Sequence, residues 1–373
     1  IFAGRGMIDS APFGFLFMVV VISMHITDFP IFGAFVLIKW RLTMTTYSEF
    51  KLAAIQAAPV YFDREASTKK ACRLIQEAGS LGATIAAFSE TWLPGYPHFI
   101  YGESFSRRPW KAAAEYLANA VEIPGPTTDR LCEAARKANL DVVIGLVERD
   151  AGTQGTAYCT LLFIASDGSI LGRHRKLKPT HKERGVWGEG DGAGLKVYER
   201  PYGRISGLNC WEHNMVLPGY VLMSQGTQIH IAAWPGSERE APPAPISLWE
   251  RQVLLSRAFA SQAAAYVIAV GGLCSAEDMP EAYREWAYPA TGDSCIIDPR
   301  GEIIAGPAEG ETILIADGSM EHIFAAKSAC DVAGHYSRPD LFQLRINQTP
   351  YQRVIKAPGP DYAAVEPGPE QNR

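Results

Sequence analysis

The sequence predicts an α/β fold in which a mixed β-sheet is covered by helices on one face. From Lys51 onward, short apolar runs of strand type alternate with segments of helical apolar spacing, and the middle of the chain has the pattern of β-hairpins. Because strands and helices do not follow a strict βαβ period, neither a TIM barrel nor a Rossmann domain is expected. No glycine-rich phosphate-binding motif follows a predicted strand, so no nucleotide cofactor is expected.

The first predicted elements follow in order from Lys51. The apolar run at 51–60 predicts a buried strand, and Asp63 can cap the helix that follows it. Gly79 and Gly82 mark the end of this helix. The run TIAAF at 84–88 predicts the next buried strand, and a helix around 127–138 precedes a strand at 142–148. The helix after Asp63 has apolar residues on one face, namely Ala66, Ala71, Leu74, Ile75 and Ala78.

The middle and the end of the chain continue the mixed pattern. Two strands at 158–166 and 169–176 are joined by the turn Asp167-Gly168 and predict a hairpin. Further strands are expected at 203–210 and 228–234, with a helix at 214–224 between them. A helix at 247–263 leads into a strand at 265–271, and 294–305 is a strand–turn–strand unit turning at 299–301.

Composition excludes several classes of protein. The chain has 373 residues, of which 47% are hydrophobic and 20% charged, and its formal net charge of −5 argues against a nucleic-acid partner. Its seven cysteines are scattered and no pair has a CxxC spacing. This fits neither a disulfide scaffold nor a zinc site, so we expect no metal and a reducing, cytoplasmic location.

Both ends differ from the central region. Residues 1–43 hold two apolar runs, 12–25 and 31–38, which are each shorter than the roughly 20 residues of a membrane span. We expect this leader to be non-native upstream sequence, with the natural start near Met44; a membrane anchor or hairpin is the alternative. Residues 44–356 are expected to form one large domain, and the Pro- and Gly-rich segment 357–373 a flexible tail. No membrane partner is expected.

Cys210 is the first candidate for chemistry. It lies at the end of a predicted strand, in GLNCWEH, just before a helical stretch. A strand-to-helix turn exposes a nucleophile, and backbone N–H groups at the helix start favour a thiolate and an oxyanion. A single cysteine is, however, more often an inert buried thiol. Its position alone therefore leaves both interpretations open.

Glu90 and Lys176 also follow predicted strands. Rigid neighbours of Glu90, among them Trp92 and Tyr96 in TWLPGYP, can desolvate its carboxylate and raise its pKa toward that of a general base. The alternative is a solvated acid at a strand end. Lys176 ends the second hairpin strand, in HRKLKPTHKER, where the alternative is a surface lysine. Spacing alone does not distinguish Lys176 from Lys178.

Five segments together carry a family resemblance. FSETWLPGYP, RHRKLKPTHKERGVWGEGDG and GLNCWEH resemble the nitrilase branch of the carbon–nitrogen hydrolase superfamily, and so do IHIAAWPG at 229–236 and GHYSRPDLF at 334–342. The likeness covers roughly Lys51 to Pro350, which makes 44–356 a carbon–nitrogen hydrolase domain. It implies a four-layer α-β-β-α sandwich with mixed sheets, and a homo-oligomer built from dimers.

The resemblance also implies an activity and roles for individual residues. Glu90 is the expected general base, Lys176 an electrostatic stabiliser, Cys210 the nucleophile and Glu183, in THKER, a second active-site glutamate. The expected reaction uses water to convert a small organic nitrile into a carboxylic acid and ammonia through a thioimidate and a thioester, without a cofactor. For the aromatic residues core packing is the alternative to substrate contact, and His213 has a structural alternative. The expected substrate-binding residues are Trp92, Tyr96, Trp187, Trp211, His213 and Trp234.

Two departures from the family pattern concern the pocket more than the chemistry. Many relatives carry a Pro-Leu pair soon after the cysteine motif, whereas this chain reads CWEHNMVLPGY, and many carry Asn at the position of Cys159. An aliphatic amidase or a cyanide-converting enzyme that uses the same three residues, Glu90, Lys176 and Cys210, is the first alternative. A non-catalytic binding protein of the same fold and a membrane-tethered enzyme are the others. A product assay on nitriles, amides and cyanide distinguishes the enzymes.

Overall fold

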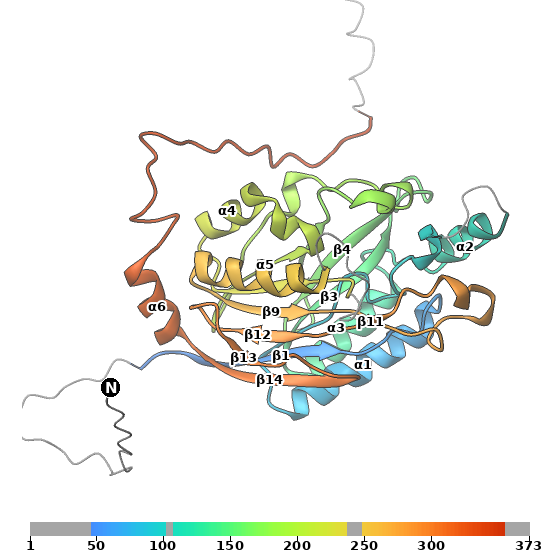
Figure 1. Cartoon of the computed structure of the whole chain (residues 1–373), viewed down its shortest axis with the longest axis horizontal. Helices are drawn as coiled ribbons and strands as arrows, with labels where there is room; N and C mark the ends of the chain where they lie inside the picture. The colour runs from blue at the N-terminus through green and yellow to red at the C-terminus, as the bar shows by residue number, and fades with distance from the viewer. Residues whose placement is uncertain (1–45, 102–106, 237–247, 355–373) are drawn as a thin grey trace, which may run out of the picture. The chain divides into compact units, whose positions relative to one another are not determined.

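The computed structural model describes residues 46–101, 107–236 and 248–354. The predicted leader at 1–43 and tail at 357–373 lie outside these ranges. Within them, twelve strands form two six-stranded mixed sheets, here called sheet A and sheet B (Figure 1). In spatial order sheet A contains β14 (Thr312–Ser319), β1 (Glu49–Gln56), β2 (Ile85–Ala87), β3 (Asp141–Arg149), β4 (Ala157–Ile164) and β5 (Ile170–Arg175). Sheet B contains β13 (Ile303–Ala305), β12 (Cys295–Ile297), β9 (Tyr266–Val270), β8 (Ile229–Ala233), β7 (Gly203–Asn209) and β6 (Tyr198–Arg200).

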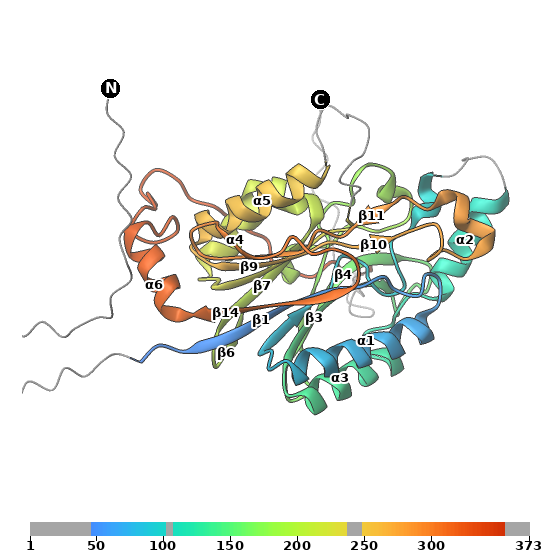
Figure 2. The same cartoon turned by 60° about the horizontal axis from the view of Figure 1, so that its bottom comes forward.

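Each sheet is covered by helices on its outer face. Helices α1 (Arg64–Ser80) and α3 (Pro126–Ala138) pack on sheet A, and α4 (Val216–Ser224) and α5 (Leu248–Ala263) pack on sheet B. Figure 2 shows the two sheets between these helix pairs. The four-layer α-β-β-α sandwich is confirmed, with two helix-covered sheets where the strand pattern alone predicts one.

Burial on both faces explains why the strands read as continuous apolar runs. In β1, Leu52 and Ala54 face sheet B, whereas Ala53 and Ile55 face α1 and α3. Parallel pairs β1–β2–β3 and β7–β8–β9 form the middle of the two sheets, where neither face is solvated. The core between the two sheets is therefore made of apolar side chains from both sheets.

Local signals set the ends of several elements. Asp63 caps α1 by accepting a hydrogen bond from the backbone N–H of Ala66 at 2.9 Å. Ala66 itself is only half-buried, so it is not part of the buried helix face as predicted; Ser67 and Thr68 are. Gly168 turns the β4–β5 hairpin at φ +87°.

Every strand and helix predicted from an apolar run is present, within a few residues of the predicted bounds. The sequence pattern misses elements that are short, edge-located or amphipathic: α2 (Arg107–Ala118), β6, β10 (Leu273–Cys274), β11 (Ala290–Thr291), β14 and α6 (Met320–Ala329). In the described part of the chain, no helix has the length and apolarity required to cross a membrane.

Candidate active site

Three strand ends bring the predicted catalytic residues together. Lys176 follows the last residue of β5, Cys210 follows the last residue of β7, and Glu90 lies three residues beyond β2. All three side chains are buried, with 2% of Glu90, 1% of Lys176 and 4% of Cys210 exposed. The charges of Lys176 and Glu90 both act on the Cys210 thiol, so the three groups share one region. Sheet A thus supplies the carboxylate and the ammonium group, and sheet B supplies the sulfur.

The Lys176 ammonium lies between two carboxylates. Its Nζ donates to Glu90 Oε1 at 2.7 Å and to Glu183 Oε2 at 2.8 Å. Glu183 lies in the 3₁₀ turn η2 (His181–Gly185), where its Oε2 also accepts the backbone N–H of Thr180 at 2.6 Å. The Tyr96 hydroxyl donates to Glu183 Oε1 at 2.8 Å. Lys178, which the sequence does not separate from Lys176, is instead half-exposed and pairs with Glu189.

Burial and charge act in opposite directions on this cluster. Burial raises the pKa of Glu90 to about 7 against the lowering effect of Lys176, and the charge of Glu183 adds to the rise. Burial alone would lower the pKa of Lys176, but Glu90, Cys210 and Glu183 together raise it well above its usual value. Lys176 is therefore a permanent cation, whereas Glu90 can exchange a proton near neutral pH.

Cys210 occupies a strained turn. Its φ is +48°, in the left-handed region, and the 3₁₀ turn η4 (Cys210–Asn214) begins at this residue. The predicted strand 203–210 accordingly ends one residue early. Burial raises the pKa of the Cys210 thiol well above its usual value, while Lys176 and the backbone N–H of Trp211 favour the thiolate. Burial thus favours the thiol form of this sulfur.

A second thiol, that of Cys159, contacts the Glu90 carboxylate. The Cys159 Sγ–H donates to Glu90 Oε1 at 3.2 Å, and burial raises the pKa of Cys159 well above its usual value, so it stays a donor. Among the described residues nothing bonds Glu90 Oε2. One carboxylate oxygen is therefore held by Lys176 and Cys159, and the other is available to a proton or a water.

His213 is hydrogen-bonded to the backbone of Cys210. Its Nδ1 lies 2.8 Å from the Cys210 carbonyl, which can only accept, so Nδ1 carries the hydrogen. Its Nε2 then accepts from His230 Nε2 at 3.0 Å, and His230 Nδ1 lies 2.8 Å from Ser206 Oγ. Burial lowers the pKa of His213 to about 4, and that of His230 well below its usual value. Both rings are neutral at physiological pH.

The predicted aromatic residues fall into two groups. Tyr96 and Trp187 meet edge to face at 5.8 Å, and the Trp187 ring centre lies 5.6 Å from Lys176 Nζ, so both adjoin the catalytic cluster. Trp211 is partly buried with the Arg251 guanidinium 5.1 Å from its ring.

Trp92 and Trp234 are placed differently. Trp92 belongs to the apolar cluster between sheet A and its helices, and its indole N–H donates to the Ala57 carbonyl at 2.6 Å. Trp234 donates to Ser256 Oγ at 3.1 Å and stacks on His213, with ring centres 5.1 Å apart. The contacts of Trp92 favour core packing, and those of Trp234 favour support of the cysteine turn.

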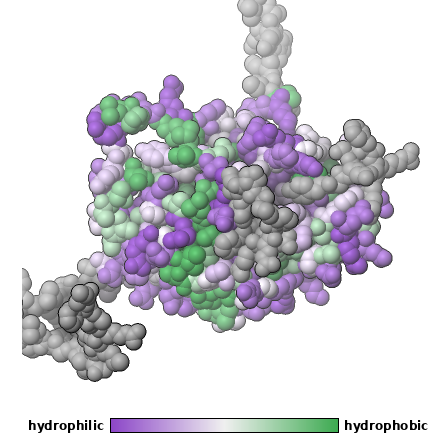
Figure 3. Space-filling model, viewed as in Figure 1, coloured by the Kyte–Doolittle hydropathy of each residue, from purple (hydrophilic) through white to green (hydrophobic). Residues whose placement is uncertain are grey.

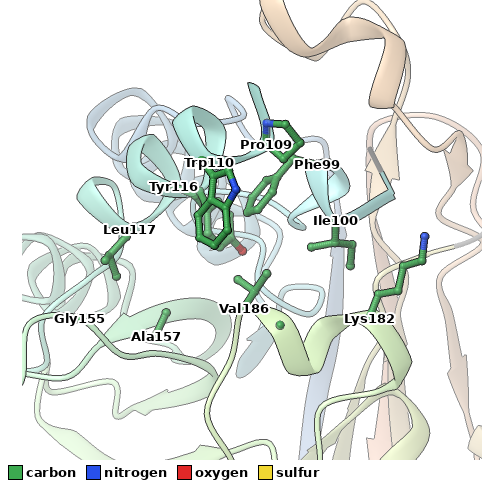
Figure 4. A pocket seen from close by; sticks show the side chains of 12 residues that line it. Phe99, Ile100, Pro109, Trp110, Tyr116, Leu117, Gly155, Ala157, Lys182 and Val186 are labelled. Atoms are coloured by element: carbon green, nitrogen blue, oxygen red, sulfur yellow. The ribbon is translucent and has the colours of Figure 1, made fainter. Parts of the chain in front are cut away.

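An apolar cavity adjoins the site on the side of η2. Its volume is about 430 Å³, and Figure 4 shows Ile100, Trp110 and Val186 around it, with Lys182 at one side. Tyr116 also lines it, and Tyr116 is close enough to Cys159 and Glu90 for their charges to help burial raise its pKa. The Tyr116 side chain thus lines this cavity and also lies near the catalytic cluster.

The sequence pattern did not indicate that several buried residues belong to the site, namely Cys159, which contacts Glu90, and His174, Glu212 and His230. For Cys159 the signal was its place on a strand paired with the lysine-bearing strand, but which glutamate it meets depends on tertiary packing. Among the residues that the structure describes, no three His, Cys, Asp or Glu side chains group as a metal site requires.

The sequence of this chain is similar to those of a known family and of several named proteins. Residues 51–327 match the carbon-nitrogen hydrolase family model. A protein called "Nitrilase 2", from an unknown prokaryotic organism, is 52% identical over 315 residues, covering 84% of this chain and 97% of that protein. The "Aliphatic nitrilase" of Rhodococcus rhodochrous is 38% identical over 320 residues, covering 82% and 86%.

Solved structures share the fold at low sequence identity. A carbon-nitrogen hydrolase from Helicobacter pylori G27 superposes with a TM-score of 0.62 at 17% identity, covering 76% of this chain and 93% of that chain. Saccharomyces cerevisiae Nit3, described as a member of branch 10 of the nitrilase superfamily, gives 0.61 at 20% identity, covering 78% and 97%.

The sandwich, the match over most of the chain and the buried cluster define one class: this chain belongs to the carbon-nitrogen hydrolase family. It is thus a hydrolase that acts on carbon–nitrogen bonds. Its similarity to proteins named as nitrilases, at up to 52% identity among those given above, places it in the nitrilase branch of that family.

Proposed function

We propose that the enzyme hydrolyses an organic nitrile to a carboxylic acid and ammonia, with Cys210 as nucleophile, Glu90 as general base and Lys176 as electrostatic stabiliser. The observation that supports this best is the Lys176 ammonium, bonded to Glu90 and Glu183 and acting on the Cys210 sulfur in a buried site. A buried lysine among two carboxylates and a thiol serves proton transfer and anion stabilisation better than it serves stability.

The proposed reaction begins with proton transfer. Ionised Glu90 takes the Cys210 proton as the sulfur adds to the nitrile carbon, and the proton then passes to the nitrile nitrogen to give a thioimidate. A water activated by Glu90 adds to this carbon, and the tetrahedral intermediate expels ammonia to leave a thioester. A second water hydrolyses the thioester, releases the acid and returns the Cys210 thiol.

Anionic charge in these steps needs donors close to Cys210. Charge develops on the nitrile nitrogen in the first step and on oxygen later. The Lys176 ammonium and the Trp211 backbone N–H both act on the sulfur position and are the proposed donors. One such donor contributes about 3–4 kcal/mol in the transition state. Glu183 would hold Lys176 in place while Glu90 changes its protonation.

The substrate would enter past the Tyr96–Trp187 pair. We propose Tyr96, Trp187 and Trp211 as substrate contacts, because they are the predicted aromatic residues that adjoin the cluster or are partly exposed. Trp234 and His213 would act through the cysteine turn. An apolar or aromatic nitrile would pack favourably against these three aromatic side chains.

The experiment is a substrate panel with a matched inactive variant. Purified protein is incubated with aliphatic, aryl and arylacetonitrile substrates, cyanide and simple amides, and ammonia, acid and amide are measured together. We expect acid and ammonia from at least one organic nitrile, and no turnover by Cys210→Ala with unchanged circular dichroism. Turnover of amides or cyanide alone, or normal activity of Cys210→Ala, would contradict the proposal.

We further propose that the enzyme assembles as a homo-oligomer built from dimers and is cytoplasmic. Large apolar side chains exposed on the segment after α6, including Leu341 and Phe342, support self-association. The seven scattered cysteines support a reducing compartment.

A further inference from the structure

Another buried carboxylate, in addition to Glu90 and Glu183, lies beside the catalytic cluster. Glu212, two residues after Cys210 in η4, is 1% exposed. Its Oε1 accepts the backbone N–H of Leu177 at 2.8 Å, and its Oε2 accepts the backbone N–H of Asn209 at 2.8 Å. Both oxygens also lie within 3.0 Å of His174 Nε2. Both oxygens of this carboxylate are thus hydrogen-bonded to a backbone N–H group and lie close to the His174 imidazole.

The two backbone groups are the immediate neighbours of catalytic residues. Leu177 follows Lys176, and Asn209 precedes Cys210. Lys176 extends β5 at the edge of sheet A, whereas Cys210 extends β7 in sheet B, and the two strands are not hydrogen-bonded to each other. Glu212 therefore joins the segment that carries Lys176, in sheet A, to the segment that carries Cys210, in sheet B.

We propose that Glu212 is a positioning residue that fixes the Lys176 ammonium relative to the Cys210 sulfur. This inference rests on the roles proposed for Lys176 and Cys210. Because each backbone N–H uses a different oxygen, both oxygens must be acceptors. A carboxamide cannot replace the carboxylate, since its NH₂ group faces either the Leu177 or the Asn209 donor. A misplacement of about 1 Å between catalytic groups can cost about 100-fold in rate.

The charge state of Glu212 agrees with this geometry. Burial would raise its pKa, but His174 and the N–H groups of Leu177 and Asn209 lower it below its usual value. Glu90, also buried, has its pKa raised to about 7. Glu90 and Glu212 therefore differ in use, because the carboxylate with raised pKa can move protons and the one with lowered pKa stays ionised.

Asp141 offers a matched control at the other end of the strands. It is also 1% exposed and also joins the sheets, since it begins β3 and accepts from the Arg200 guanidinium at 2.6 and 3.0 Å and from the Tyr202 hydroxyl at 2.5 Å. Arg200 ends β6 and Tyr202 directly precedes β7, whereas Glu212 lies beyond the end of β7. Asp141→Asn thus removes a comparable buried link without touching the active site.

The test compares Glu212→Gln, Glu212→Asp and Asp141→Asn. For Glu212→Gln we expect kcat to fall 10- to 100-fold with KM within about twofold, because the substrate contacts are kept and the reacting groups are displaced. Asp141→Asn should lower the melting temperature at least as much but keep kcat within about twofold. Glu212→Asp keeps two ionised acceptors on a shorter side chain, so its kcat should be intermediate.

Alkylation of Cys210 by iodoacetamide supplies a readout independent of nitrile turnover. In Glu212→Gln, its rate should rise at higher pH than in the natural enzyme, because Lys176 supports the thiolate less well. Wild-type kcat in Glu212→Gln, or an equal loss in Asp141→Asn at similar melting temperature, overturns the proposal. If Glu212→Gln does not fold, the kcat and alkylation profile of Glu212→Asp decide in the same way. Failure of the proposed function would appear differently, as absence of nitrile turnover in the natural enzyme.

Discussion

At the scale of single residues, the proposed mechanism makes activity depend on the protonation of Glu90. Its carboxyl must be ionised to take the Cys210 proton, and its pKa is raised to about 7 by burial despite Lys176. We therefore expect kcat/KM to rise with pH through about 7 and then level off. Because Lys176 keeps its charge well above that range, the acid side of the profile reports mainly on Glu90.

Cys159 provides a direct test of this assignment. Its S–H bond to Glu90 stabilises the carboxylate and lowers the pKa of Glu90, so Cys159→Ala should raise that pKa. The acid side of the kcat/KM profile should then move to higher pH by about half to one pH unit, as expected for one lost hydrogen bond. Cys159→Ser keeps a donor and should leave the profile near its original position. An unchanged profile in Cys159→Ala would show that Glu90 is not the titrating base.

Removal of Lys176 should affect chemistry more than binding. Lys176→Ala leaves Glu90 and Glu183 as two buried carboxylates without their shared cation, and it removes a proposed donor to the developing anion. We expect kcat to fall by about 100- to 1000-fold in steady-state assays of ammonia release. The residual activity should need higher pH, because Lys176 lowers the pKa of Glu90. A change confined to KM would assign Lys176 to substrate binding instead.

How far the sequence predicts this site depends on the kind of signal. Glu90, Lys176, Glu183 and Cys210 lie in motifs that resemble nitrilase segments, so their place could be predicted, although the catalytic roles stay proposals. The contacts of Cys159 with Glu90 and of Glu212 with Leu177 could not be predicted from sequence, because they join residues separated by 35 or more positions. For Trp92 and Trp234, aromatic character alone does not distinguish a pocket wall from packing.

At the scale of elements, the loop that carries Glu90 depends on a glycine in the neighbouring strand. Gly145, in β3, lets the backbone of residues 89–91 lie against it, since a Cβ there would be 2.1 Å from the Ser89 carbonyl oxygen and 2.6 Å from the Thr91 nitrogen. These are backbone atoms, so the clash cannot be relieved by a side-chain rotation. Gly145→Ala must therefore move the segment that contains Glu90.

We expect Gly145→Ala to lower stability by about 3 kcal/mol, at the upper end for overpacking, and to abolish most activity even where it folds. Denaturant unfolding and ammonia release measure the two effects. Gly155→Ala is the control, because its added Cβ has no heavy atom within 3.5 Å, its nearest neighbour being the Thr153 carbonyl oxygen at 3.8 Å. Full activity in Gly145→Ala would mean that the Glu90 loop is not fixed by this contact.

The strength of the apolar signal explains which elements were predictable. Strands buried on both faces, such as β3 and β4, read as continuous apolar runs and were predicted. Strand β14 pairs with β1 over eight residues, yet its outer edge is half-solvated and its sequence includes Asp317 and Gly318. Pairs as short as β10 and β11 hold only two residues each, too few for any periodicity.

At the scale of the whole molecule, the segment after α6 leaves apolar side chains exposed. Residues 331–354 contain no regular helix or strand and run along the outside of the sandwich (Figure 1). The hydropathy surface in Figure 3 shows apolar groups scattered in patches among polar ones. Leu341 is 61% exposed and Phe342 is 79% exposed. Such side chains stay largely in contact with water when a single chain folds, so they are the first candidates for contacts in the proposed oligomer.

The last prediction concerns this proposed assembly. Leu341→Ser combined with Phe342→Ser removes apolar surface that a single subunit leaves in water, so the fold should be kept while association weakens. Sedimentation velocity should show a shift of the natural oligomer toward smaller species at equal protein concentration, with the circular dichroism spectrum unchanged. Trp110→Ser is the control, because Trp110 is 74% exposed but lies on α2 beside the apolar cavity rather than on this segment. An unaltered size distribution in the double variant would place the subunit contacts on another surface. A similar shift in Trp110→Ser would show that any loss of exposed apolar surface, rather than this segment, weakens the association.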